Sequence, residues 1–410
     1  MKRRVVIVSA GVLAPVGSTW EEFQRNIFLE RDWFEPLAKE LPYPAGARVD
    51  DAALDAFYRQ KGRAFKYRRY YNRATDMAVV AAFECLKNLQ PASIDPQEMN
   101  LFWGAGPNFD LSAIPEATFS VEPADQPKSH HGVSAAWMLL YLPNMTASAI
   151  SCALGIRGET LTYLTACAAA SHAIGEAFLK IRNGDLDCVL CGGSDSRLNR
   201  GGLQAYKMLG ALSPSPEPRV LPFCKERDGF VPGEGAAAFL LMDADTAQTL
   251  NTPILAELVG YGSSSDGFRL TDPEPGGLGM ETAMKKALRM ARMAPGEIDL
   301  IDAHGTGTLK NDAAEAAAIR RVFPFPVPVT SNKSQFGHLS AAAGALELAA
   351  CLAMLRRGEA TPTVNTVGKT VEEGIELVRK NRSMPLRTIL SNSFGFGGEN
   401  CALVVKRWEP

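Results

Sequence analysis

The sequence predicts a mixed α/β protein built from two similar halves. Helical and β-like segments alternate along the chain, which is the first indication of this class. A tight turn, a helix of small residues and a closing glycine occur at Thr165–Gly184 and again at Phe336–Gly358. A β-like run ending in two glycines follows each, at Gly192–Gly193 and at Gly397–Gly398. These recurring features indicate duplication of one α/β unit.

The first half is assigned to residues 1–250, and its elements follow from apolar spacing and glycine positions. Apolar and β-branched runs predict strands, and apolar residues three and four apart predict helices. In chain order we expect a strand at Val5–Ser9, a loop at Gly11–Gly17, an irregular surface excursion at Arg31–Tyr71, a helix at Ala74–Leu89, a strand at Leu101–Gly106, a helix at Ala170–Ile181 and a strand at Cys188–Leu190.

The second half, residues 251–410, has a similar order of elements. Two of its strands run directly into glycine-rich polar segments, where side chains are poorly covered. We expect strands at Ile254–Tyr261, Ile298–Ala303 and Thr388–Leu390, and helices at Glu281–Met293 and Ala341–Arg357.

Composition narrows the function classes. The formal net charge is −2, so nothing indicates a surface for nucleic acid. The eight cysteines are scattered through apolar stretches, which favours a reducing, cytoplasmic location. The start, Met1–Val8, lacks the features of a signal peptide. Ser129–Ile156 carries no charged side chain, but its polar residues favour buried segments or a subunit interface over a membrane span.

Cys167 is the first candidate catalytic residue. It lies between a β-like run and a helix whose first turn is almost all alanine. The positive end of a helix favours a thiolate, and its free N–H groups can stabilise an oxyanion. Taken alone, a buried structural cysteine at a crowded turn would explain the pattern better.

Two histidines strengthen the case for catalysis. The chain has five histidines, and two of them lie in glycine-framed turns. His304 follows an apolar strand in Asp302-Ala-His-Gly-Thr-Gly-Thr308, and His338 lies in Lys333-Ser-Gln-Phe-Gly-His338. Either could be a hydrogen-bonded structural histidine. One cysteine and two such histidines together favour an active site.

These motifs, with Asn392-Ser-Phe-Gly-Phe-Gly-Gly398, resemble the signatures of the elongating β-ketoacyl-acyl-carrier-protein synthases. The resemblance runs in order from Arg3 to near the C-terminus. It implies a thiolase fold with five layers, α-β-α-β-α, and a decarboxylative condensation of a bound acyl thioester with malonyl-acyl-carrier protein. The product would be a 3-oxoacyl-acyl-carrier protein in fatty acid, polyene or polyketide biosynthesis. Since decarboxylation generates the carbanion equivalent, we expect no metal and no organic cofactor.

The resemblance also implies roles for individual residues. Cys167 would attack the acyl thioester, and His304 and His338 would promote decarboxylation. Lys333 would be a buried cation that orients this cluster, with Glu347 as its counter-charge. Phe394 would complete the oxyanion hole through its N–H and gate the acyl pocket with its ring.

Substrate-binding residues are implied around these groups. Thr306 and Thr308 would contact the phosphopantetheine arm. Pro107 and Phe109 replace a glycine-rich segment of the family and, with Phe396, would line an altered acyl pocket. For Asp312 and Glu315, a family role and a solvated helix face are equally good explanations.

The expected partners are an acyl carrier protein and a second copy or a related ketosynthase-like chain. A degradative thiolase would need a second catalytic cysteine near the C-terminus, and Cys401 looks like a core residue. A non-catalytic or chain-length-determining partner subunit is the remaining alternative. Such subunits usually lack the nucleophile, whereas Cys167 is present.

Overall fold

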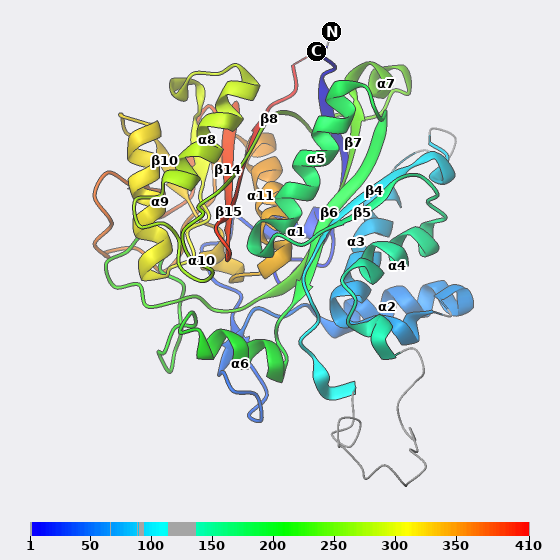
Figure 1. The fold of residues 1–410 in the computed structure, drawn as a ribbon, viewed down its shortest axis with the longest axis horizontal. Helices are drawn as coiled ribbons and strands as arrows, with labels where there is room; N and C mark the ends of the chain where they lie inside the picture. Colours follow the sequence, from blue (N-terminus) through cyan, green and yellow to red (C-terminus); the bar gives the residue numbers. More distant parts are fainter. Residues whose placement is uncertain (1, 66, 88, 90–93, 114–136, 410) are drawn as a thin grey trace.

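A continuous eleven-stranded sheet forms the centre of the molecule (Figure 1). The computed structural model describes residues 2–409 except 66, 88, 90–93 and 114–136. In spatial order the strands are β12 (Glu376–Leu377), β10 (Pro328–Thr330), β9 (Leu300–Asp302), β14 (Thr388–Gly395), β15 (Glu399–Lys406), β8 (Ala256–Ser265), β1 (Val5–Leu13), β7 (Glu234–Asp243), β6 (Cys188–Ser196), β4 (Asn100–Ala105) and β5 (Thr160–Tyr163).

The two halves of this sheet repeat one topology. In the first half β5, β4 and β6 are parallel, and β7 and β1 continue the sheet antiparallel. In the second half β10, β9 and β14 are parallel, and β15 and β8 continue it antiparallel. The halves meet where β1 pairs with β8, with Val5 opposite Leu258. The expected duplication is therefore confirmed, while the boundary at residue 250 stays a prediction.

Helices pack in three layers around the two halves of the sheet, as Figure 1 shows. The central layer consists of α5 (Ala169–Asn183) and α11 (Ala343–Arg357). The outer helices are α3 (Arg73–Lys87) and α4 (Asn144–Leu154) on the first half, and α8 (Leu278–Ala291) and α9 (Leu309–Val322) on the second. This is the expected five-layered arrangement.

Small residues bring the central helices close to the sheets. Every residue of α11 from Ala343 to Leu355 is buried, because this helix has protein on all sides. A Cβ on Gly104 or on Gly193 would overlap Ala170 in α5. The alanine-rich turn after Cys167 is therefore explained first by packing between the two halves of the sheet.

The region Arg31–Tyr71 is more ordered than the sequence suggested. It contains α2 (Asp51–Lys61), whose first turn is capped by the side chain of Asp50 at 2.9 Å from the N–H of Ala52. Leu54 and Tyr58 of this helix are buried. The other α-helices and strands of the described residues are α1 (Trp20–Asn26), α6 (Arg200–Met208), α7 (Ala244–Thr249), α10 (Lys333–Phe336) and the two-residue strands β2 (Glu35–Pro36), β3 (Ala45–Gly46), β11 (Glu359–Ala360) and β13 (Arg382–Ser383).

Of the uncharged stretch Ser129–Ile156, residues 129–136 lie outside the described residues. The rest includes α4, which packs on α3 and on β4 and β5. None of the helices in the described part of the chain has the length and apolar character that a membrane crossing requires.

Candidate active site

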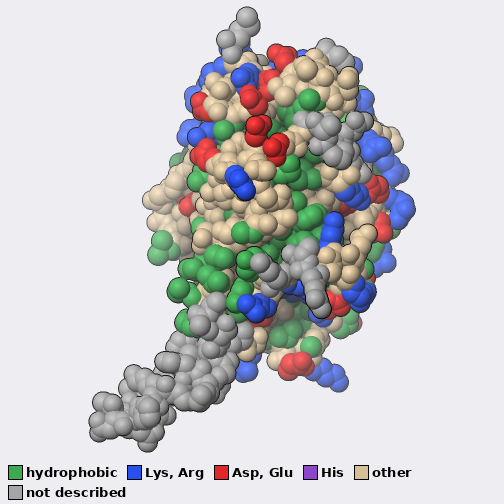
Figure 2. Space-filling view, turned by 90° about the vertical axis from the view of Figure 1, so that its right-hand side faces the viewer, with side chains coloured by type: hydrophobic (Ala, Val, Ile, Leu, Met, Phe, Trp, Pro, Cys, Tyr) green, Lys and Arg blue, Asp and Glu red, His purple; other side chains and the backbone are tan. Residues whose placement is uncertain are grey.

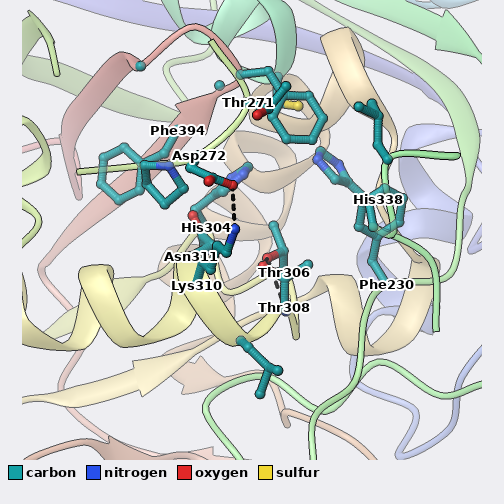
Figure 3. A pocket seen from close by; sticks show the side chains of 18 of the residues that line it. Phe230, Thr271, Asp272, His304, Thr306, Thr308, Lys310, Asn311, His338 and Phe394 are labelled. Atoms are coloured by element: carbon teal, nitrogen blue, oxygen red, sulfur yellow. Dashed lines mark hydrogen bonds and ion pairs between the residues drawn. The ribbon is translucent and has the colours of Figure 1, made fainter. Parts of the chain in front are cut away.

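Cys167, His304, His338 and Phe394 come together around one cavity of about 280 Å³. Each lies at or close to the end of a helix, turn or strand. Cys167 belongs to a 3-10 turn, η7 (Ala166–Ala168), before α5, and His304 follows β9. His338 comes after α10, and Figure 3 shows both imidazoles at this cavity with Thr306 and Thr308. The three catalytic candidates are thus brought together from distant parts of the chain.

The backbone before Cys167 is strained. Ala166 has a φ of 45°, a left-handed conformation that side chains other than glycine rarely adopt. The thiol that this turn presents is only 5% exposed. Burial raises the pKa of Cys167 to about 11, against the opposing effects of Lys333 and of a hydrogen bond from the Phe396 backbone N–H. Burial of the thiol therefore opposes the thiolate that the position at the start of the helix favours.

A buried chain of polar contacts holds His304. Lys333 Nζ lies 3.1 Å from His304 Nδ1 and forms an ion pair with Glu347. A lysine ammonium only donates, so Nδ1 accepts and the His304 proton sits on Nε2. Burial, with the Lys333 charge adding to it, lowers the pKa of His304 well below its usual value. His304 is therefore a neutral imidazole that carries an Nε2–H.

His338 reaches the same state by a different contact. Its Nδ1 accepts a hydrogen bond from the backbone N–H of Ser340 at 3.2 Å, which leaves the proton on Nε2. Burial first, and the Lys333 charge second, lower the pKa of His338 well below its usual value. The two imidazole rings lie edge to face with their centroids 5.4 Å apart. The site therefore offers two neutral N–H donors side by side.

Two buried carboxylates shape the turn that carries His304. Glu315 accepts hydrogen bonds from the backbone N–H groups of His304 at 2.9 Å and Gly305 at 2.8 Å. Asp312 accepts from the Gly307 N–H at 3.1 Å. Both side chains are fully buried, so the solvated helix face considered for them is wrong. Their spacing on α9 turns both toward the loop instead.

The expected roles of the two phenylalanines need a correction. Phe394 lies inside β14, opposite Asn400 of β15, and its buried ring packs against His304 at 5.9 Å between centroids. The backbone N–H that reaches the Cys167 sulfur belongs to Phe396. The Phe396 ring is 37% exposed and lines the cavities on both sides of Cys167. The backbone contact with Cys167 and the ring beside the cavities favour Phe396 over Phe394 for the roles expected there, and these roles stay a prediction.

The mouth of the cavity carries Thr306 and Thr308. Their hydroxyl oxygens are 2.9 Å apart, and both side chains line the cavity. Nearby, Lys310 forms an ion pair with Asp272 at 2.7 Å across the opening, and both are seen in Figure 3.

A second cavity of about 350 Å³ lies on the other side of Cys167. Pro107, Phe109 and Phe396 line it, as expected of an acyl pocket. Two further lining residues, Asp195 and Arg197, were missed by the sequence analysis. The sequence contains an indication of this, because Asp195 and Arg197 are two residues apart after a β-like run and so point to the same face of a strand.

Comparison with known proteins places the chain in a family. Residues 2–247 match the family profile "Beta-ketoacyl synthase, N-terminal domain", and residues 255–367 match "Beta-ketoacyl synthase, C-terminal domain". The chain belongs to the β-ketoacyl synthase family. A relative from Coxiella burnetii named 3-oxoacyl-[acyl-carrier-protein] synthase 2 is 32% identical, over 99% of each chain. A relative of the same name from Staphylococcus aureus strain N315 is 30% identical over 99% of each chain.

Solved structures of ketosynthases share the fold over the whole chain. A β-ketoacyl synthase from Burkholderia phymatum STM815 has a TM-score of 0.89 at 29% identity, with 100% of each chain covered. The ishigamide ketosynthase/chain length factor has a TM-score of 0.88 at 27% identity, with the same coverage. The thiolase fold and the acyltransferase class expected for this ketosynthase are confirmed.

A degradative thiolase would need a second cysteine at the site, and Cys167 is the only cysteine among the described residues that line the two cavities. Cys401 is fully buried in β15, opposite Ser393 and Ser263 of the neighbouring strands. It does not line either cavity next to Cys167. Its place in the core agrees with the apolar run in which it occurs.

Proposed function

We propose that this ketosynthase condenses an acyl group held on Cys167 with malonyl-acyl-carrier protein, giving a 3-oxoacyl-acyl-carrier protein and CO2. The observation that carries this proposal is the shared cavity of one thiol and two neutral imidazoles, each with an Nε2–H available. Condensation needs a nucleophile that holds the acyl chain, and hydrogen-bond donors for an enolate oxygen.

The first step is acyl transfer. Cys167 Sγ attacks the carrier-bound thioester carbon, the carbon–sulfur bond to the phosphopantetheine breaks, and the thiol proton ends on the departing sulfur. The backbone N–H groups of Cys167 and Phe396 receive the oxyanion that forms on the way. The contact of the Phe396 N–H with the sulfur supports this assignment, which replaces Phe394 in that role.

The second step is condensation. The malonyl carboxylate leaves as CO2, and its electron pair forms an enolate whose oxygen accepts hydrogen bonds from His304 and His338. The enolate carbon attacks the thioester carbonyl on Cys167, and the Cys167 thiolate departs and takes up one proton. Lys333 keeps the His304 proton on Nε2 by occupying Nδ1, which is why a buried cation suits this place.

We propose an acyl carrier protein as the partner that delivers both substrates. A solved structure that resembles this chain at 26% identity is titled as a type II PKS acyl-carrier protein in complex with its ketosynthase. In this chain Thr306 and Thr308, which line the cavity of Cys167, would bind the phosphopantetheine arm. The location would be the cytoplasm, and the product would enter fatty acid, polyene or polyketide synthesis.

A second ketosynthase-like chain is proposed to cover the edge of the sheet at β5. This strand pairs on one side only among the described strands; Leu161 within it is 39% exposed and Leu164 directly after it is 50% exposed. Figure 2 shows hydrophobic side chains gathered on the face that lies at the right of Figure 1. An uncovered apolar strand edge of this kind favours a subunit contact. A purely chain-length-determining role is disfavoured because Cys167 and both imidazoles share one cavity.

The proposal is tested by supplying acyl- and malonyl-acyl-carrier protein together and following CO2 and the 3-oxoacyl product. We expect one CO2 for each product with the unchanged protein, and no product with Cys167→Ala. Product formation by Cys167→Ala at the parental rate would overturn the proposal.

A further inference from the structure

The cavity behind Cys167 combines an apolar wall with a single buried arginine. Its apolar side includes Ala105, Pro107, Leu164, Ala205 and Leu209. Arg197 is the one cationic side chain among the described residues that line it, and it is only 4% exposed. A saturated acyl chain cannot accept a hydrogen bond from a buried guanidinium. Burying such a group without hydrogen-bond partners costs free energy. The buried Arg197 side chain therefore indicates a function in this cavity.

Arg197 is held firmly by three neighbours. Its Nη2 donates to Asp195 at 3.0 Å, and its Nη1 donates to the backbone oxygen of Pro107. The ring of Phe109 lies under the guanidinium, 4.5 Å from its carbon. A Cβ on Gly106 would overlap the guanidinium, so the glycine leaves the space that Arg197 occupies. The side chain is fixed in place and does not need to reorganise on binding.

Not all of the donors of Arg197 are used by these contacts. A guanidinium carries about five N–H donors, and the protein hydrogen bonds of Arg197 go to Asp195 and Pro107 alone among the described residues. Its Nε is buried with no hydrogen-bond partner in the described part of the chain. Because Nε is not exposed to the cavity, the donors left for a ligand are the N–H groups of Nη1 and Nη2 that the bonds to Pro107 and Asp195 do not use.

We propose that the acyl chain held in this cavity carries a neutral oxygen, as a keto or hydroxyl group, and that Arg197 donates a hydrogen bond to it. The inference rests on the proposed function, since it names the substrate class of that same site. A neutral acceptor fits better than a carboxylate, because Asp195 already balances the Arg197 charge and would repel a second anion.

A second polar pair in the same wall supports an oxygenated chain. The hydroxyl oxygens of Tyr206 and Ser340 are 2.6 Å apart, and both residues line the cavity. One hydroxyl donates to the other, so a hydroxyl hydrogen of the pair remains for a ligand. The cavity thus offers donors from Arg197 and from this pair, which a plain hydrocarbon chain would leave unsatisfied.

The test compares acyl-carrier-protein donors of equal chain length that are saturated, hydroxylated or oxidised to a ketone at successive carbons, or end in a carboxylate. The rate constant for acylation of Cys167 is measured by intact-protein mass spectrometry. The variant is Asp195→Asn/Arg197→Met, which removes both charges together and so avoids an unpaired buried ion. The Asp195 side chain now accepts a hydrogen bond from the Ala341 N–H at 3.1 Å, and the amide of the Asp195→Asn change keeps an oxygen for that donor.

We expect the unchanged protein to prefer an oxygenated donor, and this preference to fall roughly 10- to 100-fold in the double variant, which is the range of a hydrogen bond to a charged group. Acylation by the saturated donor should persist and report an intact nucleophile. Leu209→Ala, in the apolar wall, is the matched control and should affect all donors alike. Equal use of the saturated and oxygenated donors, a preference for the carboxylate, or an unchanged ratio in the double variant would overturn the inference alone. No acylation by any donor would overturn the proposed function with it.

Discussion

Lys333 Nζ lies 3.1 Å from His304 Nδ1, and the same ammonium forms an ion pair with Glu347 in the fully buried centre of the molecule. One charge therefore fixes the tautomer of an imidazole and compensates a carboxylate on α11. Burial raises the pKa of Glu347, which the Lys333 charge opposes. The stability of the core and the donor state of His304 are thus linked through one side chain.

Mutations can separate the effect of Lys333 on stability from its effect on the protonation of His304. Lys333→Met leaves the buried Glu347 carboxylate without its cationic partner, and we expect the free energy of unfolding to fall by about 3–5 kcal/mol. The double variant Lys333→Met/Glu347→Gln removes both charges and should recover most of this loss in urea unfolding. It should not recover malonyl decarboxylation, since His304 has lost its donor at Nδ1. A double variant that decarboxylates normally would contradict the role of Lys333.

His338 offers a more direct test of enolate stabilisation. His338→Ala removes an Nε2–H from the cavity, and we expect CO2 release from malonyl-acyl-carrier protein to fall roughly 100- to 1000-fold, as for a lost oxyanion donor. Acylation of Cys167 should continue, which provides the internal control. Decarboxylation at the parental rate would show that His338 is structural.

The state of Cys167 predicts a pH dependence. Because burial raises its pKa to about 11, the thiol form dominates below that pH. Alkylation of Cys167 by iodoacetamide should rise about tenfold per pH unit from about pH 7 to about pH 10, because only the thiolate reacts. Peptide mass spectrometry separates Cys167 from the exposed Cys152. A plateau reached near neutral pH would indicate that the helix dipole prevails after all.

The two phenylalanines of the β14 end should respond differently to truncation. Phe394 is buried against His304, so Phe394→Ala should lower the free energy of unfolding by about 3–5 kcal/mol. Phe396 is 37% exposed, so Phe396→Ala should cost far less stability and should instead change which acyl donors load Cys167. Equal stability losses in urea unfolding would contradict this division.

Much of the fold could be predicted from local patterns in the sequence. The alternation of helices and strands, the repeated turn–helix–glycine unit and the β-runs ending in Gly-Gly were enough to predict two similar halves. The α2 helix was missed, because its face is narrow: only Leu54 and Tyr58 are buried, and charged residues surround them. What holds this helix is a cap at Asp50 and tertiary packing, neither of which gives a strong periodic signal.

The residue types of the site could be predicted from the sequence, whereas their burial and exact positions could not. Cys167, His304, His338 and Lys333 lie where their motifs implied. The buried state of the thiol depends on the two halves of the sheet packed around α5 and α11, which no local pattern reveals. Which of Phe394 and Phe396 lines the cavity behind Cys167 depends on where β14 ends, and this strand ends at Gly395, between them. Asp195 and Arg197 alternate along the end of β6, but only the cavity between them and Cys167 gives that alternation a meaning.

The most direct test of the central claim is the mass of the protein after incubation with an acyl-acyl-carrier protein alone. We expect one acyl group to be added, with fragmentation placing it on the peptide that contains Cys167. Cys167→Ala should gain no mass, although its cavity and both imidazoles are unchanged. An acyl group on another residue, or the same gain in Cys167→Ala, would contradict the account.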